Sequence, residues 1–152
     1  VSQPRIISGC DLDDHMMLGA LSELNFHYVN SHFTHPDDAL DPERGAELGW
    51  KELCKRFDNY MDWLYRSAPG LRNFTGTELS AAVQRFVAIV PHKDISDTRM
   101  VISIGHFVDD AQFLVRFNEK SPKSVDGGEL THLTGELYLL EANKSTVTVH
   151  FE

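Results

Sequence analysis

The chain has 152 residues, of which 41% are hydrophobic and 24% charged, a composition typical of globular domains that bury a core without disulfide bonds. Its formal net charge is −9 and it lacks a basic run, which argues against nucleic-acid binding. No apolar stretch approaches the roughly 18 residues that a membrane span needs. No signal peptide is evident, and the chain starts at Val1 rather than Met, which suggests a piece of a longer protein.

The first part of the sequence alternates short apolar runs with a helical period. Arg5–Gly9 and Tyr28–Phe33 are predicted strands, and His15–Leu24 is a predicted helix between them. Three aspartates precede this helix and can cap its N-terminus. Because the helix is apolar on much of its surface, we expect it to be covered on both sides.

Two further helices are expected before residue 86. Apolar residues at i, i+3, i+4 and i+7 predict an amphipathic helix over Glu47–Arg66, which the Pro69-Gly70 pair ends. The segment Thr75-Gly76-Thr77-Glu78 has the pattern of a capping box, in which a threonine hydroxyl and a glutamate satisfy each other's backbone amides. It predicts a short helix over Thr77–Arg85.

Period-2 alternation dominates the rest of the chain. Phe86–Val90 is predicted as a strand, and further strands are expected near residues 100–104, 113–117, 137–140 and 146–151, separated by turn-forming residues. Short strands at this spacing are typical of an antiparallel β-sandwich. The sequence therefore predicts an α+β fold, with βαβα units in residues 1–85 and a β-sandwich accessory domain in residues 86–152.

The polar residues that could carry chemistry follow the two predicted strands. In a parallel α/β arrangement the loops after neighbouring strands converge, and histidine beside carboxylate suits acid–base catalysis or metal binding. The candidates in the first loop are Cys10, Asp11, Asp13, Asp14 and His15, and those in the second are His32, His35, Asp37, Asp38 and Asp41.

Structural roles compete with each of these assignments. The aspartates, including Asp41 before Pro42, can serve as helix caps, and the histidines can be structural. Because residues i and i+3 of a strand point to opposite faces, His32 and His35 are not expected to share a metal. The sequence has no Gly-rich phosphate loop, nucleophile elbow or zinc-spaced cysteine pair. Cys54 is expected to be a small core residue.

The aromatic residues of the β half have two interpretations. They can fill the core and rim of the sandwich, or present faces on which sugars stack. They are Phe107, Phe113, Phe117, Tyr138 and Phe151.

The stretch Tyr28-Val29-Asn30-Ser31-His32-Phe33-Thr34-His35-Pro36-Asp37-Asp38 resembles the late strand of NodB-like polysaccharide deacetylases. The similarity continues through Gly49-Trp50-Lys51-Glu52-Leu53, Ser67-Ala68-Pro69-Gly70-Leu71-Arg72 and Thr75-Gly76-Thr77-Glu78-Leu79. It covers about residues 5–85 and is greatest to the divergent, Pel-type branch of bacterial exopolysaccharide deacetylases, in which a β-sandwich follows the barrel.

The resemblance implies a catalytic role for this segment. The family's last motif is an apolar residue, two others, then His and Asp, and its His is the general acid toward the leaving amine. Val29-Asn30-Ser31-His32 matches it, although Phe33 stands where the family usually has Asp, so His35 with Asp37 is the alternative.

The resemblance also implies what this chain does not carry. The family's metal ligands and catalytic base lie upstream, so no cofactor is expected in this chain and a zinc-like divalent metal is expected in the full-length enzyme. The chain is then the C-terminal part of a periplasmic or extracellular bacterial deacetylase that modifies an exopolysaccharide in biofilms. Its partners would be the polysaccharide and the upstream polypeptide, without nucleic acid or a membrane span, and it would be inactive alone. The alternative is a non-catalytic carbohydrate-binding or structural β-sandwich module.

Overall fold

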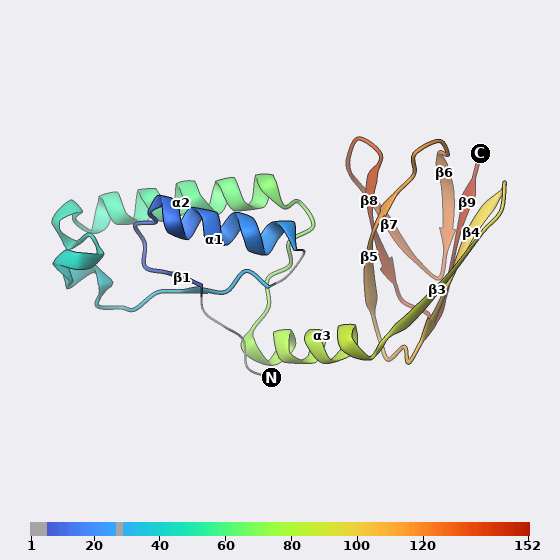
Figure 1. Cartoon of the computed structure of the whole chain (residues 1–152), viewed down its shortest axis with the longest axis horizontal. Coiled ribbons are helices and arrows are strands. Elements are labelled where there is room, and N and C mark those ends of the chain that lie inside the picture. The colour runs from blue at the N-terminus through green and yellow to red at the C-terminus, as the bar shows by residue number, and fades with distance from the viewer. Residues whose placement is uncertain (1–5, 27–28) are drawn as a thin grey trace. The chain divides into compact units, whose positions relative to one another are not determined.

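The computed structural model describes residues 6–26 and 29–152 and has a mixed α+β fold (Figure 1). The chain forms two compact units, which divide between Leu71 and Arg72 and are called here the α/β unit and the β unit. The predicted division into residues 1–85 and 86–152 stays a prediction. Arg5 and Tyr28, which begin the two predicted strands, lie outside the described residues.

The α/β unit begins with a βαβ arrangement. Strand β1 (Ile7–Ser8) and strand β2 (His32–Phe33) are parallel, with Ile7 opposite His32 and Ser8 opposite Phe33. Helix α1 (Asp14–Asn25) connects them. Both strands lie within the predicted segments but are shorter, because only two residue pairs join the parallel ladder. The parallel order agrees with the rule that crossover helices join parallel strands.

Three short 3₁₀ turns precede the long helix of this unit. They are η1 (Asp38–Leu40), η2 (Pro42–Arg44) and η3 (Ala46–Leu48), and helix α2 (Trp50–Ser67) follows. The predicted helix began at Glu47, three residues earlier. Gly45 has a φ of 94° and lies where a Cβ atom would come 3.0 Å from the Leu53 side chain. The left-handed backbone at this glycine therefore lets the turns fold back against α2.

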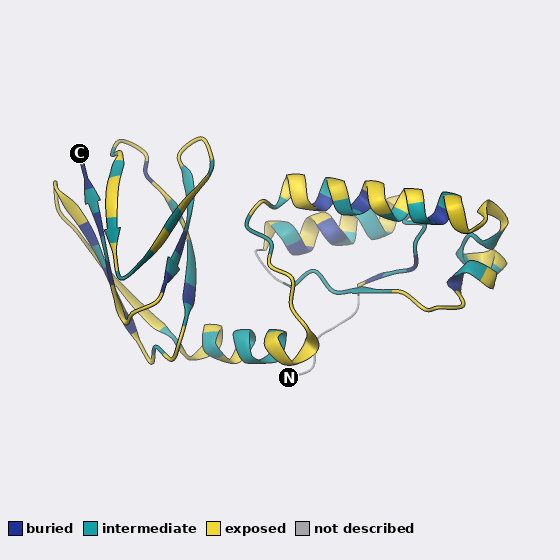
Figure 2. Ribbon diagram, turned by 180° about the vertical axis from the view of Figure 1, so that it is seen from behind, coloured by how far each residue is buried: buried dark blue, intermediate teal, exposed yellow. Residues whose placement is uncertain are grey.

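The apolar faces of the two helices meet over the parallel strands. Ile7, Ala20, Tyr60 and Leu64 form the buried cluster of the described part of this unit. The expectation that α1 is covered on both sides is wrong, since Leu18 is 61% and Leu21 42% exposed. Figure 2 shows exposed positions along both helices. The two strands are too few to give α1 a second apolar surface to pack on.

Helix α3 (Gly76–Ala88) opens the β unit and has the predicted capping box. The Thr75 hydroxyl accepts from the Glu78 amide, and the Glu78 carboxylate accepts from the Thr75 amide at 2.8 Å. The predicted strand Phe86–Val90 is wrong, because α3 continues to Ala88. Pro91 disfavours helical backbone at Val90, and strand β3 (Val90–Ile95) begins there.

The strands of the β unit form two antiparallel sheets. One has the order β3-β4-β9-β6 and the other the order β5-β8-β7. The remaining strands are β4 (Arg99–Gly105), β5 (Ala111–Arg116), β6 (Pro122–Asp126), β7 (Gly128–Thr134), β8 (Leu137–Ala142) and β9 (Thr146–Phe151). Strands β6 and β7 were not predicted, because β6 is polar with a register shift and β7 has few apolar residues.

Side chains from both sheets share one core. Its buried members are Met100, Ile102, Ile104, Ala111, Phe117, Leu140, Ala142, Val147, Val149 and Phe151. The aromatic side chains pack within it or against it, as when the Phe117 ring meets those of Tyr138 and Phe151 at 5.3 and 5.7 Å. The core interpretation of these aromatic residues is therefore confirmed.

Candidate functional site

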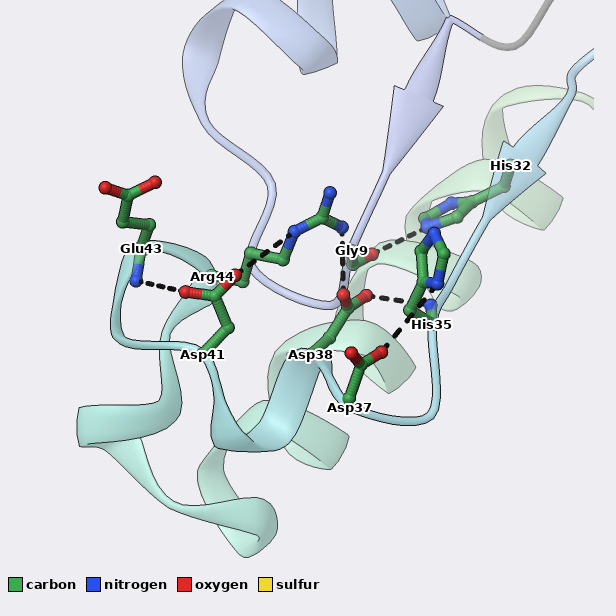
Figure 3. Close-up of polar contacts among 8 residues, drawn as sticks. All are labelled: Gly9, His32, His35, Asp37, Asp38, Asp41, Glu43 and Arg44. Atoms are coloured by element: carbon green, nitrogen blue, oxygen red, sulfur yellow. Dashed lines mark hydrogen bonds and ion pairs between the residues drawn. The ribbon is translucent and has the colours of Figure 1, made fainter.

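The loop after β1 meets both β2 and the loop after β2, as the parallel order predicts, and a Cβ atom at Gly9 would lie 3.9 Å from Oδ2 of Asp38. The Gly9 amide donates to the Phe33 carbonyl at 2.8 Å, and the His32 ring bonds through Nε2 to the Gly9 carbonyl at 2.7 Å (Figure 3). Because a carbonyl only accepts hydrogen bonds, Nε2 carries a proton in this contact. In the neutral ring, Nδ1 is then an unprotonated nitrogen with a free lone pair.

The His32 ring lies against the aromatic face of α2. Its centroid is 5.2 Å from that of Phe57, edge-on, and 5.4 Å from that of Tyr60. Nδ1 is buried and has no hydrogen-bond partner among the described residues. An unsatisfied buried polar atom costs about 1–3 kcal/mol, so packing alone gives a poor account of this histidine.

His35 and Asp37, the other candidate catalytic residues, are held more loosely. Nδ1 of His35 lies 3.7 Å from a carboxylate oxygen of Asp37, beyond hydrogen-bonding distance, and the two side chains are 47% and 80% exposed. The His35 ring also packs edge-on against Phe33, at a centroid distance of 4.2 Å. His32 is therefore fixed but covered, whereas His35 is accessible but weakly oriented.

Asp38 holds the second loop in place. Its side chain is 3% exposed, accepts from the His35 amide at 3.0 Å and from Nη1 of Arg44 at 2.8 Å (Figure 3). Asp41 also lies 3.7 Å from Arg44 and accepts from the Glu43 amide, which confirms its predicted capping role. Sequence reasoning missed Arg44, since no periodicity links it to Asp38.

The three aspartates before α1 have different roles. Asp13 caps the helix by accepting from the Met16 amide at 2.8 Å, and Asp14 is the acidic residue of its first turn. Asp11 instead pairs with Arg56 of α2. The capping interpretation is therefore confirmed for Asp13, while Asp11 joins the first loop to α2.

A second polar network was also missed. Glu23 of α1 is 5% exposed and accepts from the Asn30 side chain at 3.1 Å, while the Tyr60 hydroxyl contacts Asn30 at 3.4 Å. Burial raises the pKa of the Glu23 carboxyl, although a hydrogen bond from the Ser31 amide opposes the shift. Burial likewise raises the pKa of Tyr60. An acidic residue on the inner side of an apolar helix was the available sequence signal.

The cysteines do not form an activated thiol pair. Both Cys10 and Cys54 are free and partly buried. Burial, then the negative charge of Asp38 and the neighbouring Cys54, raise the pKa of the Cys10 thiol, which disfavours the reactive thiolate.

Metal binding and membrane insertion were assessed over the described residues. Within 6–26 and 29–152, no group of three or more His, Cys, Asp or Glu side chains is placed to hold a metal ion. In that same part of the chain, no helix has both the length and the apolar character needed to cross a membrane. The chemistry that the residues present can offer is a positioned imidazole beside a carboxylate-rich loop.

The sequence matches one family model, described as an uncharacterised protein conserved in bacteria (DUF2194), over residues 1–139. The chain therefore belongs to this bacterial family. No curated protein and no solved structure matches it.

Proposed function

We propose that this member of the DUF2194 family supplies the closing βα units and a following β-sandwich of a bacterial polysaccharide deacetylase. The full enzyme would be a hydrolase that removes acetyl groups from an exopolysaccharide in the periplasm or outside the cell. The observation that carries the proposal is His32 in the parallel strand β2, where one ring nitrogen is fixed and the other has no partner among the described residues.

The geometry of His32 suits a general acid. The Gly9 carbonyl holds the proton on Nε2 and so fixes the ring orientation, as the orienting group does in other catalytic histidines. Nδ1 is then the ring atom left to exchange a proton with the leaving amine. Because Nδ1 is buried in this structure, the assignment requires that the α/β unit opens access to it in the full enzyme. His35, with Asp37, is the alternative acid, because its more exposed ring is easier for a substrate to reach.

The incomplete packing of the α/β unit also supports the proposal. Parallel sheets are normally covered on both faces and contain more than two strands. Here two strands pair, and apolar side chains such as Leu18, Phe26 and Trp50 are 61%, 80% and 66% exposed. Further βα units of a barrel would cover such surfaces.

The metal of such an enzyme does not fit the residues described here. His35, Asp37 and Asp38 lie in one loop, yet Asp38 is committed to Arg44 and to the His35 amide. We therefore assign the metal ligands to the upstream polypeptide. The chain alone is expected to be inactive.

The test is acetate release from an acetylated amino-sugar polymer by the full-length polypeptide. His32→Ala should lower kcat by about 10²–10⁴, the usual contribution of a general acid, and His35→Ala should have a much smaller effect. His92→Ala, at an exposed position of β3, is the matched control and should leave kcat unchanged. Unchanged activity of His32→Ala would contradict the assignment, and a large loss with His35→Ala alone would transfer the role to His35.

The second candidate is a non-catalytic carbohydrate-binding or structural module. It is favoured by the β unit, whose two sheets share their own core. Titration with oligosaccharides followed by NMR separates the two candidates. Shifts confined to residues 86–152, with no loss of activity in the histidine variants, would favour binding by the module.

A further inference from the structure

A cavity of about 600 Å³ opens within the β unit. It lies between the two sheets, on the side where β3 is the edge strand of one sheet and β5 is the edge strand of the other. Its floor is formed by core side chains that are apolar, namely Met100, Ile102, Phe113, Val115, Phe117 and Phe151. The core of the two sheets is thus reachable from outside at this one side.

The two edge strands contribute to the cavity in different ways. β5 contributes four consecutive residues, Phe113 to Arg116, whose side chains alternate between opposite faces. The cavity therefore runs along the backbone edge of β5. β3 contributes alternate residues, Pro91, Lys93 and Ile95, so the cavity lies over one face of β3.

These positions match those of an additional strand. Among the described residues, β5 pairs with β8 on one side and its other edge carries no ladder. A strand added there would make the smaller sheet four-stranded and cover the inner face of β3, whose six residues are all exposed. On the opposite side, β6 continues into β7 through Gly127 and links the sheets.

Hydrogen-bonding chemistry distinguishes the possible occupants. An acyl chain in the cavity would bury backbone amide and carbonyl groups of β5 without partners, at about 1–3 kcal/mol for each group. An extended peptide satisfies the same groups and places alternate side chains on the apolar floor. The free edge therefore favours a peptide over a lipid.

Charge defines the peptide further. The Lys93 side chain lines the cavity from β3 and makes no hydrogen bond or ion pair with another described residue, and the same holds for the Arg116 side chain at the end of β5. Lys120 is engaged by the carbonyls of Ser96 and Asp97. Glu119 also lines the cavity, but the three cations outnumber this one carboxylate, so the lining is complementary to an acidic side chain.

We propose that the free edge of β5 accepts an extended segment of a partner protein as an additional strand, with alternate apolar side chains in the cavity and an acidic residue facing Lys93. The partner is a protein with an alternating apolar and polar segment that contains this acid. The interaction is independent of the proposed deacetylase activity.

The test presents a probe strand at high effective concentration. The sequence Thr-Val-Thr-Asp-Thr-Val-Thr is fused to the C-terminus of the full chain, next to Phe151 at the cavity, through a 12-residue Gly/Ser linker. Such a linker spans about 17–21 Å and gives millimolar effective concentration. NMR hydrogen exchange then follows the backbone amides of β5 that do not bond to β8. Binding of the probe strand should slow the exchange of these amides at least tenfold.

Charge exchange tests the orientation. Lys93→Glu should abolish the protection, and a probe with lysine in place of aspartate should restore it in that variant. Lys123→Glu, on the opposite edge strand β6, is the matched control and should leave protection intact. A probe with proline at alternate positions cannot donate to the ladder and should give no protection.

Three results would overturn the proposal. They are no protection of β5 even with the tethered probe, equal protection with the proline probe, and equal protection after Lys93→Glu. Perturbation of the cavity residues by sodium decanoate without any effect of the peptide would also overturn it and assign the cavity to acyl chains.

Discussion

The two units of this chain differ in where their apolar side chains lie. In the β unit, ten described residues from both sheets form one buried cluster. In the α/β unit, the buried cluster has four described residues. Both units expose large apolar side chains, such as Trp50 at 66% in the α/β unit and Phe86 at 74% in the β unit. The two units therefore differ in the size of their buried clusters, and we expect the β unit to be the more stable of the two.

Polar organisation shows the reverse difference. The α/β unit holds the buried Asp38, which pairs with Arg44, the buried Glu23, and the ring nitrogen of His32 that has no partner among the described residues. The ion pairs of the β unit, such as Arg85 with Asp110 at 2.8 Å, join partly exposed side chains. Among the described residues, the buried polar groups therefore lie in the unit with the smaller buried cluster. Substitutions in each unit can test this.

The largest effect is expected in the core of the β unit. Leu140 is fully buried, so Leu140→Ala should lower the free energy of unfolding by about 2–5 kcal/mol through lost burial and a residual cavity. Leu114→Ala, at a 44% exposed position of β5, is the control and should cost much less. Urea unfolding measures both. Equal losses would show that the two positions are packed alike and that the β-unit core is misassigned.

A smaller loss is expected from the buried carboxylate of the α/β unit. Asp38→Asn removes the charge that Arg44 meets and leaves one of two donors without an acceptor, which should cost about 1.5–3 kcal/mol. Asp37→Asn is the matched control at the neighbouring, 80% exposed position and should be nearly neutral. Thermal unfolding compares the two variants, and an equal shift in Tm would contradict the role of Asp38.

The smallest effect concerns Glu23 and depends on pH. Burial raises the pKa of its carboxyl in the folded state, so the folded chain favours the protonated form. This contribution to stability is present below the ordinary pKa of glutamate and is lost as the pH rises through the raised value. Glu23→Gln should therefore be more stable than the parent chain at pH 7, and this advantage should disappear near pH 4. If Glu23→Gln instead lost more stability relative to the parent chain at pH 7 than at pH 4, the assigned direction of the Glu23 pKa shift would be wrong.

Local patterns predicted much of this fold. Period-2 alternation located the core strands β4, β5, β8 and β9, and the i, i+3, i+4 spacing located α2. The capping box correctly placed the start of α3, but its end was missed, because Phe86 and Val87 suit a helix or a strand equally well by apolar character. Strand β6 was missed because hydrogen bonds to β9, not side-chain pattern, define it.

The candidate site was predictable only in part. Parallel strand order correctly predicted that the loops after β1 and β2 meet, which the proximity of Gly9 to the Asp38 side chain shows. The pairing of Asp38 with Arg44 could not be predicted, because it depends on the two consecutive 3₁₀ turns η1 and η2 that bring the side chains together. The network of Glu23, Asn30 and Tyr60 joins the end of α1 and the segment after it to α2, and Tyr60 is 30 residues from Asn30. Such contacts follow from tertiary structure rather than from local spacing.

The central claim, that the β unit is the more stable of the two units, is tested most directly by hydrogen exchange in increasing urea. Exchange followed by mass spectrometry resolves segments of α1 and α2 from segments of β4 and β9. The account predicts that the α1 and α2 segments lose protection at a lower urea concentration, in a separate transition. A single transition shared by both units, or earlier loss in β4 and β9, would contradict it.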